Sequence, residues 1–528
     1  MKNTHFVIAL LLFCNVMNAQ IKFSEAIGGP QPDEALYCKP TTDGGYVSVG
    51  WTKSFGAGNW DLYLVKTNAD GSLQWTKTYG GPGDEVDCSI EQTADGGYII
   101  ASRSNSFSAI SSDIYLVKTD GSGNLVWSKT YGGADWEEGH SIIITTDGYL
   151  HVGYTKSFGA GEEDIYVMKN DLNGNIMWAK TYGGAGFDLG HKIKLDADGN
   201  ILIAGGSNSF SEAHDWDYYL LKLDLNGNTL WGKTFGGWKN DIGWDVVTYS
   251  NGYFLAGLSE SNSAGENDLC IIKVDTQGNL IWSKLYGGVS NDGAYSISKT
   301  NDGALFVVGE TESFGNGEED ICAMKIDTNG NIMWAKTYGG EGEDGSQYGQ
   351  PTADGGFIIS GYTESFGAGD WDFYIIKTDE NGDAGGCFET DIILTPNTQN
   401  MTAHSAQTIT SNASFVMYYA NSGVSYGGDL LQCQFTAIEN VDDNSSIKIY
   451  PNPATDFITV NTSYLPKNKD LKFQLKNLLG QTISSGKLNP TNSAQPEQIK
   501  VSTLNNGFYF LEISANEKTI LNQKFIKN

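Results

Sequence analysis

The stretch NGNIMWAKTYGG, residues 173–184, decides the fold because it recurs along most of the chain. A degenerate seventh copy without Trp stands at residues 21–29, where IKFSEAIGG aligns with LQWTKTYGG at residues 73–81. A constant period of this size indicates a repeat architecture, in which each unit adds one supersecondary element to a shared core. The repeated Trp, always in the context x-W-x-K-x-[YF]-G-G, returns every 51 to 53 residues at Trp75, Trp127, Trp178, Trp231, Trp282 and Trp334.

Each repeat predicts four short strands. In the third unit we expect them near residues 141–145, 149–154, 164–169 and 175–182. Asp-Gly and Asn-Gly-Asn sequences between these strands favour tight hairpins, because Gly and Asn accept the positive φ of such turns. The chain holds 66 Gly but only 11 Pro, and Trp and Tyr are abundant, which favours strands over helices. Four strands in about 50 residues are typical of a propeller blade.

The last repeat lacks its fourth strand. It runs through Asn381-Gly382 and then breaks into DAGGC at residues 383–387, where a Trp strand should follow. The surplus strand at residues 21–27 therefore predicts a ring in which the N-terminus completes the last blade, and closure hides sheet edges that a linear array would expose. We expect an all-β chain: a seven-bladed β-propeller of four-stranded blades over residues 20–386, closed by the N-terminal strand, then a small antiparallel β-sandwich.

The repeat resembles the bacterial seven-bladed β-propeller repeats abbreviated SBBP. The similarity covers residues 21–386 and rests on D-x-Y-[LV]-V-K, D-x-x-G-N-[IL]-x-W-x-K-T-Y-G-G and D-G-G-Y-I-I-x-G-x-T-x-S-F. The resemblance implies the fold, and it implies no ligand or activity, because members of that family mostly lack an assigned one.

The N-terminus and the charge predict an exported protein. Lys2, the apolar run from Phe6 to Val16 and Ala19 are typical of a signal peptide over residues 1–19. No later segment approaches the roughly 20 apolar residues of a membrane helix, so we expect no transmembrane segment. The formal net charge of −30 makes nucleic acid an unsuitable partner, because binding it requires Lys and Arg at the phosphates. The acidity favours a soluble secreted surface.

Export places the remaining cysteines in an oxidising compartment, where disulfides persist. Cys387 and Cys433 flank a polar connecting segment, residues 387–438, and are the preferred disulfide pair. Cys270 and Cys322 hold the same place in neighbouring repeats and are interpreted as buried apolar residues. The remaining two, at positions 38 and 88, fall in adjacent inner strands, which leaves a second disulfide open.

A linker at residues 439–446 leads into a C-terminal domain over residues 447–528. Short runs there alternate apolar and polar residues, which predicts a small antiparallel, immunoglobulin-like sandwich. The sequence resembles the type A sorting domain of the type IX secretion system. The motif residues are Tyr450, Pro451, Asn452, Pro453, Gly480, Gln481, Gly507, Tyr509, Lys524 and Lys527.

This resemblance implies a route and partners for the chain. After Sec export, the type IX translocon would recognise the domain, and a sortase-like peptidase would cleave it. The cargo would then be secreted or held at the cell surface, outside the outer membrane. Whether it is anchored or released, and where the domain is cut, stay open.

The longer loops, Y-G-G-x-x-x-[DE] and T-x-S-F-G-A-G-x-x-D, are expected on one face of the disc. Two carboxylate positions in these loops recur in every unit and are interpreted as acceptors of backbone N–H groups, with a cation-binding rim as the alternative. A Lys in every third strand is interpreted as solvated or locally paired. One position, entering the innermost strand, varies instead: Leu36, Cys88, His140, His191, Trp244, Tyr295 and Gln347.

At this variable position, His140, His191, Trp244, Tyr295 and Gln347 are the candidate ligand-binding residues. Their rings suit stacking on sugars or holding a peptide, and the alternative is packing between blades. The sequence has no G-x-S-x-G, H-E-x-x-H, P-loop or zinc-ligand spacing, so we assign no catalytic residue, metal or cofactor. The leading hypothesis is a non-catalytic glycan- or protein-binding module. The alternative is a secreted hydrolase or lyase with its site at the channel mouth.

Overall fold

The structure is a computed structural model of the chain, and it divides into two compact units, residues 1–437 and 438–528. The residues that it describes are 20–107, 111–211, 214–385, 389–398, 401–406, 409–412, 416–419, 429–433, 449–450, 456–460, 471–476, 482–488, 497–504, 507–515 and 518–527.

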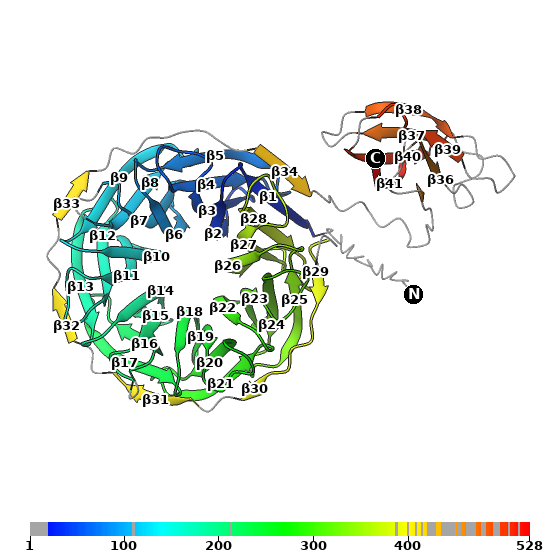
Figure 1. Cartoon of the computed structure of the whole chain (residues 1–528). Helices are drawn as coiled ribbons and strands as arrows, with labels where there is room; N and C mark the ends of the chain where they lie inside the picture. The colour runs from blue at the N-terminus through cyan, green and yellow to red at the C-terminus, as the bar shows by residue number, and fades with distance from the viewer. Residues whose placement is uncertain are drawn as a thin grey trace, which may run out of the picture. The chain divides into compact units, whose positions relative to one another are not determined.

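The first unit is a ring of seven antiparallel sheets, the blades, around a central axis (Figure 1). This confirms the all-β, seven-bladed prediction. The innermost strands are β2 (Asp33–Pro40), β6 (Glu85–Gln92), β10 (Glu137–Thr145), β14 (Asp188–Leu195), β18 (Asp241–Tyr249), β22 (Asp292–Lys299) and β26 (Asp344–Pro351). The second strands are β3 (Tyr46–Thr52), β7 (Tyr98–Ser104), β11 (Gly148–Thr155), β15 (Ile201–Ser207), β19 (Gly252–Ser259), β23 (Leu305–Thr311) and β27 (Phe357–Thr363).

The third and fourth strands complete each blade outward. The third strands are β4 (Asp61–Thr67), β8 (Asp113–Thr119), β12 (Asp164–Asp171), β16 (Asp217–Leu223), β20 (Asp268–Val274), β24 (Asp320–Ile326) and β28 (Asp372–Thr378). The fourth strands are β5 (Leu73–Tyr79), β9 (Leu125–Gly132), β13 (Ile176–Gly183), β17 (Thr229–Gly236), β21 (Leu280–Tyr286), β25 (Ile332–Tyr338) and, for the seventh blade, β1 (Phe23–Gly28). Blades are numbered one to seven from β2 to β26.

The N-terminal strand closes the ring, as predicted. β1 pairs antiparallel with β28, with Phe23 opposite Lys377 and Ile27 opposite Phe373. The side chains of Phe23 and Ile27 are buried in a core that also holds Tyr63 of the first blade. The first and last parts of the propeller are therefore joined by sheet hydrogen bonds and by apolar packing.

The repeated aromatic residues fasten each blade to the next. Tyr131, in the fourth strand of blade two, donates its hydroxyl to the carbonyl of Gly174 in the hairpin of blade three, at 2.6 Å. A Cβ at Gly174 would lie 2.9 Å from the Trp127 ring, and its φ of +76° also favours Gly. The Asn-Gly hairpin is therefore both a turn and the surface against which the aromatic residues of the neighbouring blade pack. The same Tyr-to-Gly bond joins Tyr182 to Gly227, Tyr286 to Gly330 and Tyr338 to Gly382.

The recurrent carboxylates hold loops, as the sequence interpretation expected. Asp33 accepts the N–H of Gly29 at 2.7 Å, and Asp61 accepts the N–H groups of Ala57 and Gly58, both at 2.9 Å. The recurrent Lys is locally paired: Lys66 lies 3.0 Å from the carboxylate of Asp43 in the first hairpin of its own blade. Equivalent pairs occur at Lys118, Lys169, Lys222, Lys325 and Lys377.

These buried carboxylates predict that mild acid stabilises the propeller. Burial, then the charges of Asp241 and Asp215, raises the pKa of Asp217 to about 7. An unfolded Asp titrates near 4, so only the folded state binds this proton between about pH 4 and 7, and its stabilisation is lost as the pH rises through 7. We expect the Tm to fall from pH 5.5 to pH 7.5, measured by calorimetry. Asp217→Asn should flatten this slope, whereas the exposed control Asp198→Asn should keep it; a slope unchanged by Asp217→Asn contradicts the assignment.

A belt of short strands runs around the rim, a feature that the sequence did not predict. Starting at residue 389, the chain travels backward around the ring and adds a fifth strand to blades six, five, four, three and two, and then, past blade one, to blade seven (Figure 1). Met401 of the belt is buried in the core between blades four and five, and Lys336 lies 2.7 Å from Asp391. The belt strands and their partners are β29 (Glu389–Asp391) on β25, β30 (Asn397–Thr398) on β21, β31 (Thr402–Ser405) on β17, β32 (Ile409–Asn412) on β13, β33 (Val416–Tyr419) on β9 and β34 (Asp429–Cys433) on β1.

The cysteine predictions have mixed outcomes. Cys387 and the side chain of Cys433 lie outside the described residues, so that disulfide stays a prediction. The second disulfide is wrong, because Cys38 and Cys88 are free, buried thiols that pack in two different apolar cores. The interpretation of the remaining two as buried apolar residues is confirmed at Cys270 and Cys322.

The second unit is an antiparallel β-sandwich. One sheet has the order β35 (Ile449–Tyr450), β36 (Phe457–Val460), β39 (Glu497–Lys500). The other has the order β38 (Thr482–Leu488), β37 (Leu471–Lys476), β40 (Gly507–Ala515), β41 (Lys518–Lys527). Leu475, Leu511 and Ile513 are fully buried in its core.

Candidate functional site

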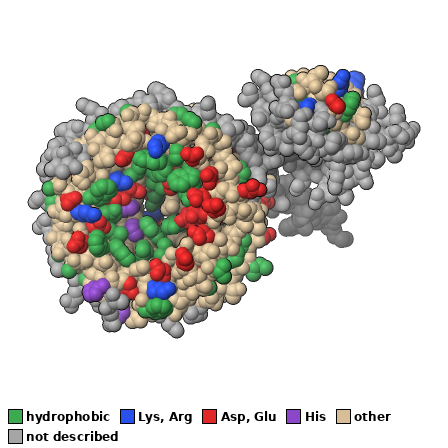
Figure 2. Space-filling model, in the orientation of Figure 1, with side chains coloured by type: hydrophobic (Ala, Val, Ile, Leu, Met, Phe, Trp, Pro, Cys, Tyr) green, Lys and Arg blue, Asp and Glu red, His purple; other side chains and the backbone are tan. Residues whose placement is uncertain are grey.

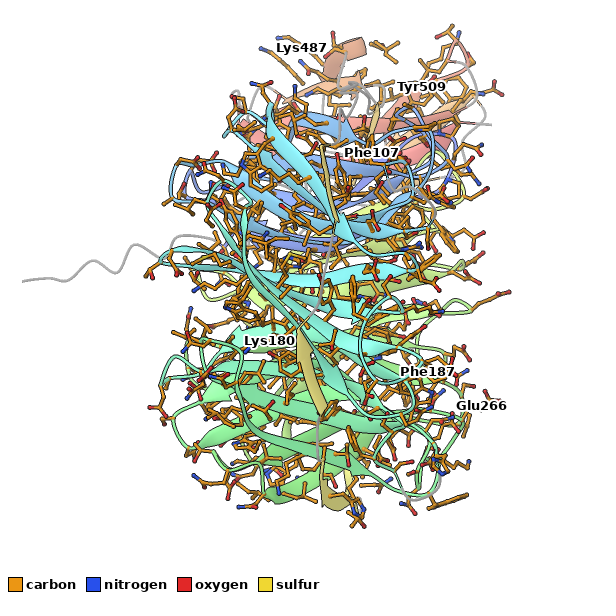
Figure 3. All side chains as sticks on the ribbon, turned by 90° about the vertical axis from the view of Figure 1, so that its left-hand side faces the viewer. Phe107, Lys180, Phe187, Glu266, Lys487 and Tyr509 are labelled. Atoms are coloured by element: carbon orange, nitrogen blue, oxygen red, sulfur yellow. The ribbon has the colours of Figure 1, made fainter. Side chains whose placement is uncertain are left out.

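The longer loops emerge on one face of the propeller, which we call the loop face. Phe187, in the loop that follows a Tyr-Gly-Gly, and Glu266, in the loop before a third strand, lie on the same side of the disc when it is seen from the rim (Figure 3). The axis opens on the loop face into a bowl of about 450 Å³. A pocket of this size falls in the range of small-molecule sites.

A β-bulge in every innermost strand supplies the wall of this bowl. In blade three the pairing of β10 with β11 shifts register between Gly139 and Ser141, so His140 has no partner on β11. A bulge bends the strand and redirects the extra side chain. Equivalent shifts occur in the other blades, and in β6 the shift spans two residues, Asp87 and Cys88. All seven residues of the variable sequence position therefore line the bowl: Leu36, Cys88, His140, His191, Trp244, Tyr295 and Gln347.

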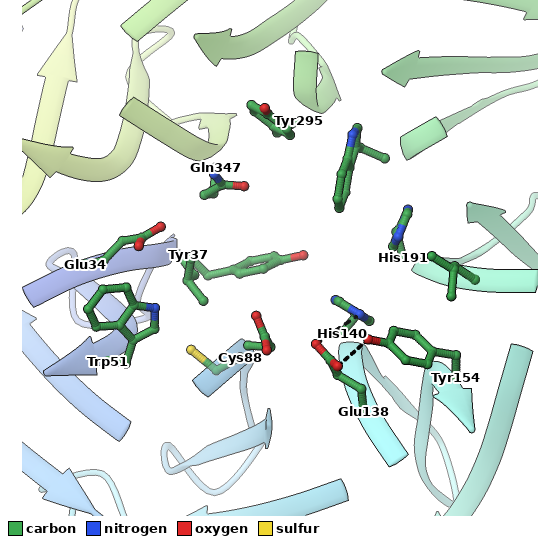
Figure 4. A pocket seen from close by; sticks show the side chains of 14 residues that line it. Glu34, Tyr37, Trp51, Cys88, Glu138, His140, Tyr154, His191, Tyr295 and Gln347 are labelled. Atoms are coloured by element: carbon green, nitrogen blue, oxygen red, sulfur yellow. Dashed lines mark hydrogen bonds and ion pairs between the residues drawn. The ribbon is translucent and has the colours of Figure 1, made fainter. Parts of the chain in front are cut away.

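Four of these residues form a row of rings around one side of the mouth, and Figure 4 labels His140, His191 and Tyr295 among them. The rings of His191 and Trp244 stack with centroids 4.1 Å apart, and Trp244 meets Tyr295 edge to face at 5.5 Å. His140 meets His191 edge to face at 5.4 Å. The aromatic row therefore runs continuously over blades three to six.

Both imidazoles in the row are neutral at physiological pH. Burial, followed by the nearby His140, lowers the pKa of His191 to about 3, although its Nδ1 lies 2.8 Å from the carbonyl oxygen of Gly243. Burial also lowers the pKa of His140. The row thus presents uncharged, amphipathic rings to a ligand.

The rest of the bowl wall, from blade one round to His140 in blade three, carries carboxyl groups that the sequence analysis did not select. Glu34, Asp87 and Glu138 line it. Glu138 accepts hydrogen bonds from the Tyr154 hydroxyl and from the Trp136 indole N–H. Burial, then the charge and the hydrogen bond of Glu138, raises the pKa of Asp87 to about 6.

Asp87 is held in an unusual backbone conformation by this arrangement. Its φ is +54°, in the left-handed region that L residues seldom adopt. The Arg103 guanidinium donates to Asp87 at 2.7 Å and lies 3.8 Å from Glu138. Arg103 also stacks over Trp136 at 4.7 Å. One cation thus lies beside two carboxyl groups, so this side of the bowl keeps a negative balance.

Below the bowl the channel is filled by side chains that cross the axis. Tyr37 of blade one stacks on Tyr348 of blade seven with centroids 4.5 Å apart. The Lys192 ammonium, from blade four, lies 4.4 Å and 4.6 Å from these two ring centroids and donates to the Tyr37 hydroxyl at 2.8 Å. Lys192 is also 3.7 Å from the carboxylate of Asp245. Tyr37 therefore forms the floor of the bowl.

The structure brings together every candidate residue from the variable position. It also shows a signal that sequence reasoning missed. The second residue of each innermost strand is apolar or Gly in five blades but is Glu34 in blade one and Glu138 in blade three. The next position is Ala, Gly or Ser in six blades but is Asp87 in blade two. Single departures from a repeated pattern mark these three carboxyls.

Part of the sorting motif lies in the described strands of the second unit. Gly507 and Lys527 pair across β40 and β41, and the side chains of Tyr509 and Lys527 are buried. Tyr450 belongs to β35, and Lys524 pairs with Phe510. The other motif residues, Pro451, Asn452, Pro453, Gly480 and Gln481, lie outside the described residues.

Two features are absent from the described ranges. These ranges contain no helix that is long and apolar enough to cross a membrane. They also contain no group of three or more His, Cys, Asp or Glu side chains arranged to hold a metal ion.

Comparison with known proteins identifies the C-terminal unit. Residues 448–528 match the family described as "Secretion system C-terminal sorting domain". Among curated proteins, the regulatory protein FlaEY of Caulobacter vibrioides is 23% identical over 336 residues, which is 57% of this chain and 34% of that protein. The chain thus spans about a third of the length of this relative.

Two solved structures are similar at low sequence identity. Puromycin hydrolase matches with a TM-score of 0.39 and 11% identity, over 70% of this chain and 54% of its own. The hemagglutinin-neuraminidase ectodomain of parainfluenza virus 5 matches with a TM-score of 0.34 and 11% identity, over 68% of this chain and 84% of its own.

Proposed function

We propose that the propeller binds carbohydrate. The C-terminal sorting domain directs the chain through the type IX system to the cell surface or the extracellular space, where such ligands are available. The observation that carries this proposal is the bowl on the loop face, which a continuous aromatic row and three carboxyl groups line together. Ring faces suit the apolar faces of sugar rings, and carboxylates accept hydrogen bonds from sugar hydroxyls. A rigid scaffold that carries such loops needs little reorganisation to bind.

The delivery route belongs to the same proposal. A signal peptide over residues 1–19 passes the chain to the periplasm, and the translocon then recognises the sorting domain and moves the propeller across the outer membrane. A sortase-like peptidase removes the domain, and the linker at residues 439–446 is its natural site of cutting.

The aromatic row gives the direct test of binding. We expect the double variant His191→Ala, Trp244→Ala to lose at least tenfold in affinity for any glycan that a glycan array identifies, because it removes the stacked pair. Calorimetric titration measures the loss, and circular dichroism reports whether the fold is kept. Trp238→Ala is the matched control, since that Trp is 65% exposed and lies outside the bowl. Equal affinity of the double variant and the parent protein excludes the bowl as the site.

A secreted hydrolase or lyase is the second candidate, and one observation favours it. The pKa of Asp87 is raised to about 6 at the edge of the bowl, and a carboxyl group with such a raised pKa suits general acid catalysis in mildly acidic conditions. A panel of glycoside substrates separates the two functions. Turnover that disappears in Asp87→Asn replaces the binding-only proposal, whereas binding without turnover supports it.

A further inference from the structure

The bowl has more carboxyl groups than a neutral sugar requires. Three carboxyl groups line it, and neither Lys nor Arg is among its lining residues. Arg103 stands behind the wall against Asp87. Below the bowl, Lys192 lies against the ring of Tyr37 and within 3.7 Å of Asp245.

Glu34 lies at the mouth, close to other carboxyl groups. Burial, then the charges of Asp87 and Glu319, raises the pKa of its carboxyl to about 8. Tyr362 and Glu310 also interact electrostatically with this group. A ligand cation among these side chains would remove the repulsive part of that shift and favour the ionised carboxylate.

A second hollow continues the acidic surface outward. It measures about 250 Å³, is lined by Glu310, Glu312 and Glu319, and shares Tyr295 with the bowl. The Tyr362 hydroxyl donates to Glu319 at 2.8 Å. Acidic side chains gather along one side of the mouth on the loop face (Figure 2). A chain lying across Tyr295 would therefore enter both hollows.

We propose that the ligand is a saccharide chain with free protonated amines. One amine lies among Glu34, Asp87 and Glu138, against the aromatic row, and a second reaches Glu310 and Glu319 in the outer hollow. Ring faces and carboxylates attract an ammonium group together, because the ring quadrupole and the negative charges act in the same direction. This inference rests on the carbohydrate-binding function and specifies its ligand class.

The test compares oligosaccharides that differ only in the amine. The full-length mature protein is titrated calorimetrically, at pH 6.5 and low salt, with β-1,4-linked glucosamine tetramer, its fully N-acetylated counterpart, cellotetraose and tetralysine. We expect the free-amine tetramer to bind at least tenfold more tightly than the other saccharides and more tightly than tetralysine, with an affinity that falls as salt is added.

Variants test whether the carboxyl groups of the two hollows bind the amines. Glu34→Gln and Glu310→Gln should each weaken the free-amine tetramer several-fold and leave cellotetraose unchanged, whereas the exposed control Glu266→Gln should have no effect. Equal binding of the acetylated and free-amine tetramers overturns the amine inference and keeps carbohydrate binding. Tightest binding of tetralysine overturns the saccharide in favour of a basic peptide. If none of these saccharides binds and a broad glycan array is also blank, the proposed function itself fails.

Discussion

Deletion of residues 20–28 is expected to abolish cooperative folding of the propeller. The deletion removes β1, which supplies the fourth strand of blade seven and lies between β28 and β34. It also empties the core that Phe23 and Ile27 share with the first blade, and it exposes the edge of β28. Calorimetry of the variant should show no transition like that of the parent protein.

Point variants test the contribution of single side chains of the closing strand to stability. Phe23→Ala should lower the free energy of unfolding by about 3–5 kcal/mol, as expected when a fully buried Phe is truncated. Ile21→Ala is the matched control, because Ile21 is 43% exposed and should change stability by about 0.5 kcal/mol or less. A synthetic peptide of residues 20–28 should restore part of the transition of the deletion variant. Normal stability of Phe23→Ala would show that the closing strand is dispensable.

Deletion of residues 447–528 is expected to stop export at the periplasm. The deleted residues form nearly all of the second unit, and strands β1–β34 lie in the first. The propeller should therefore stay folded and accumulate inside the outer membrane, with surface and medium signals reduced at least tenfold. Immunoblots of periplasm, outer membrane and medium measure the distribution.

Two further experiments separate loss of the signal from loss of folding. Joining residues 438–528 to an unrelated periplasmic carrier should export the carrier. In the full chain, Tyr509→Ser, at a buried position, should impair export, whereas Ile483→Ser, at a position 45% exposed, should not. Normal export of the truncated propeller refutes the role of the domain.

The repeat allowed the ring to be predicted because each blade repeats the same local signals. The period counted the blades, the Asn-Gly hairpins placed the strands, and the missing fourth strand after Asn381 identified the N-terminus as its replacement. These are local patterns or alignments within one sequence, so no knowledge of distant contacts was needed.

The belt escaped prediction because its strands carry little pattern. Most are four residues or shorter, which is too short for an alternation of apolar and polar residues to be recognised. They bind the outer edges of blades mainly through backbone groups, which any sequence supplies. Residues 387–438 therefore looked like a polar connection. Their order around the ring depends on tertiary contacts alone.

The sequence predicted only part of the site. The row from His140 to Tyr295 was found because a position that varies inside a repeat invites attention. The carboxyls of Asp87 and Glu138 were missed because they stand at neighbouring positions that look ordinary in the other blades. The raised pKa of Asp87 arises from burial and from its neighbour Glu138, and both causes exist only once the blades are assembled.

The belt also determines how the molecule bears load. The peptide chain leaves the propeller after β34, so any pull transmitted through the C-terminal end reaches β34 first and then β33 and β32 in turn. Each of these strands is held to its blade as a separate patch of backbone hydrogen bonds. A protein tethered at its C-terminal end in flowing liquid would thus shed rim strands one at a time, and the blades that carry the bowl would yield last.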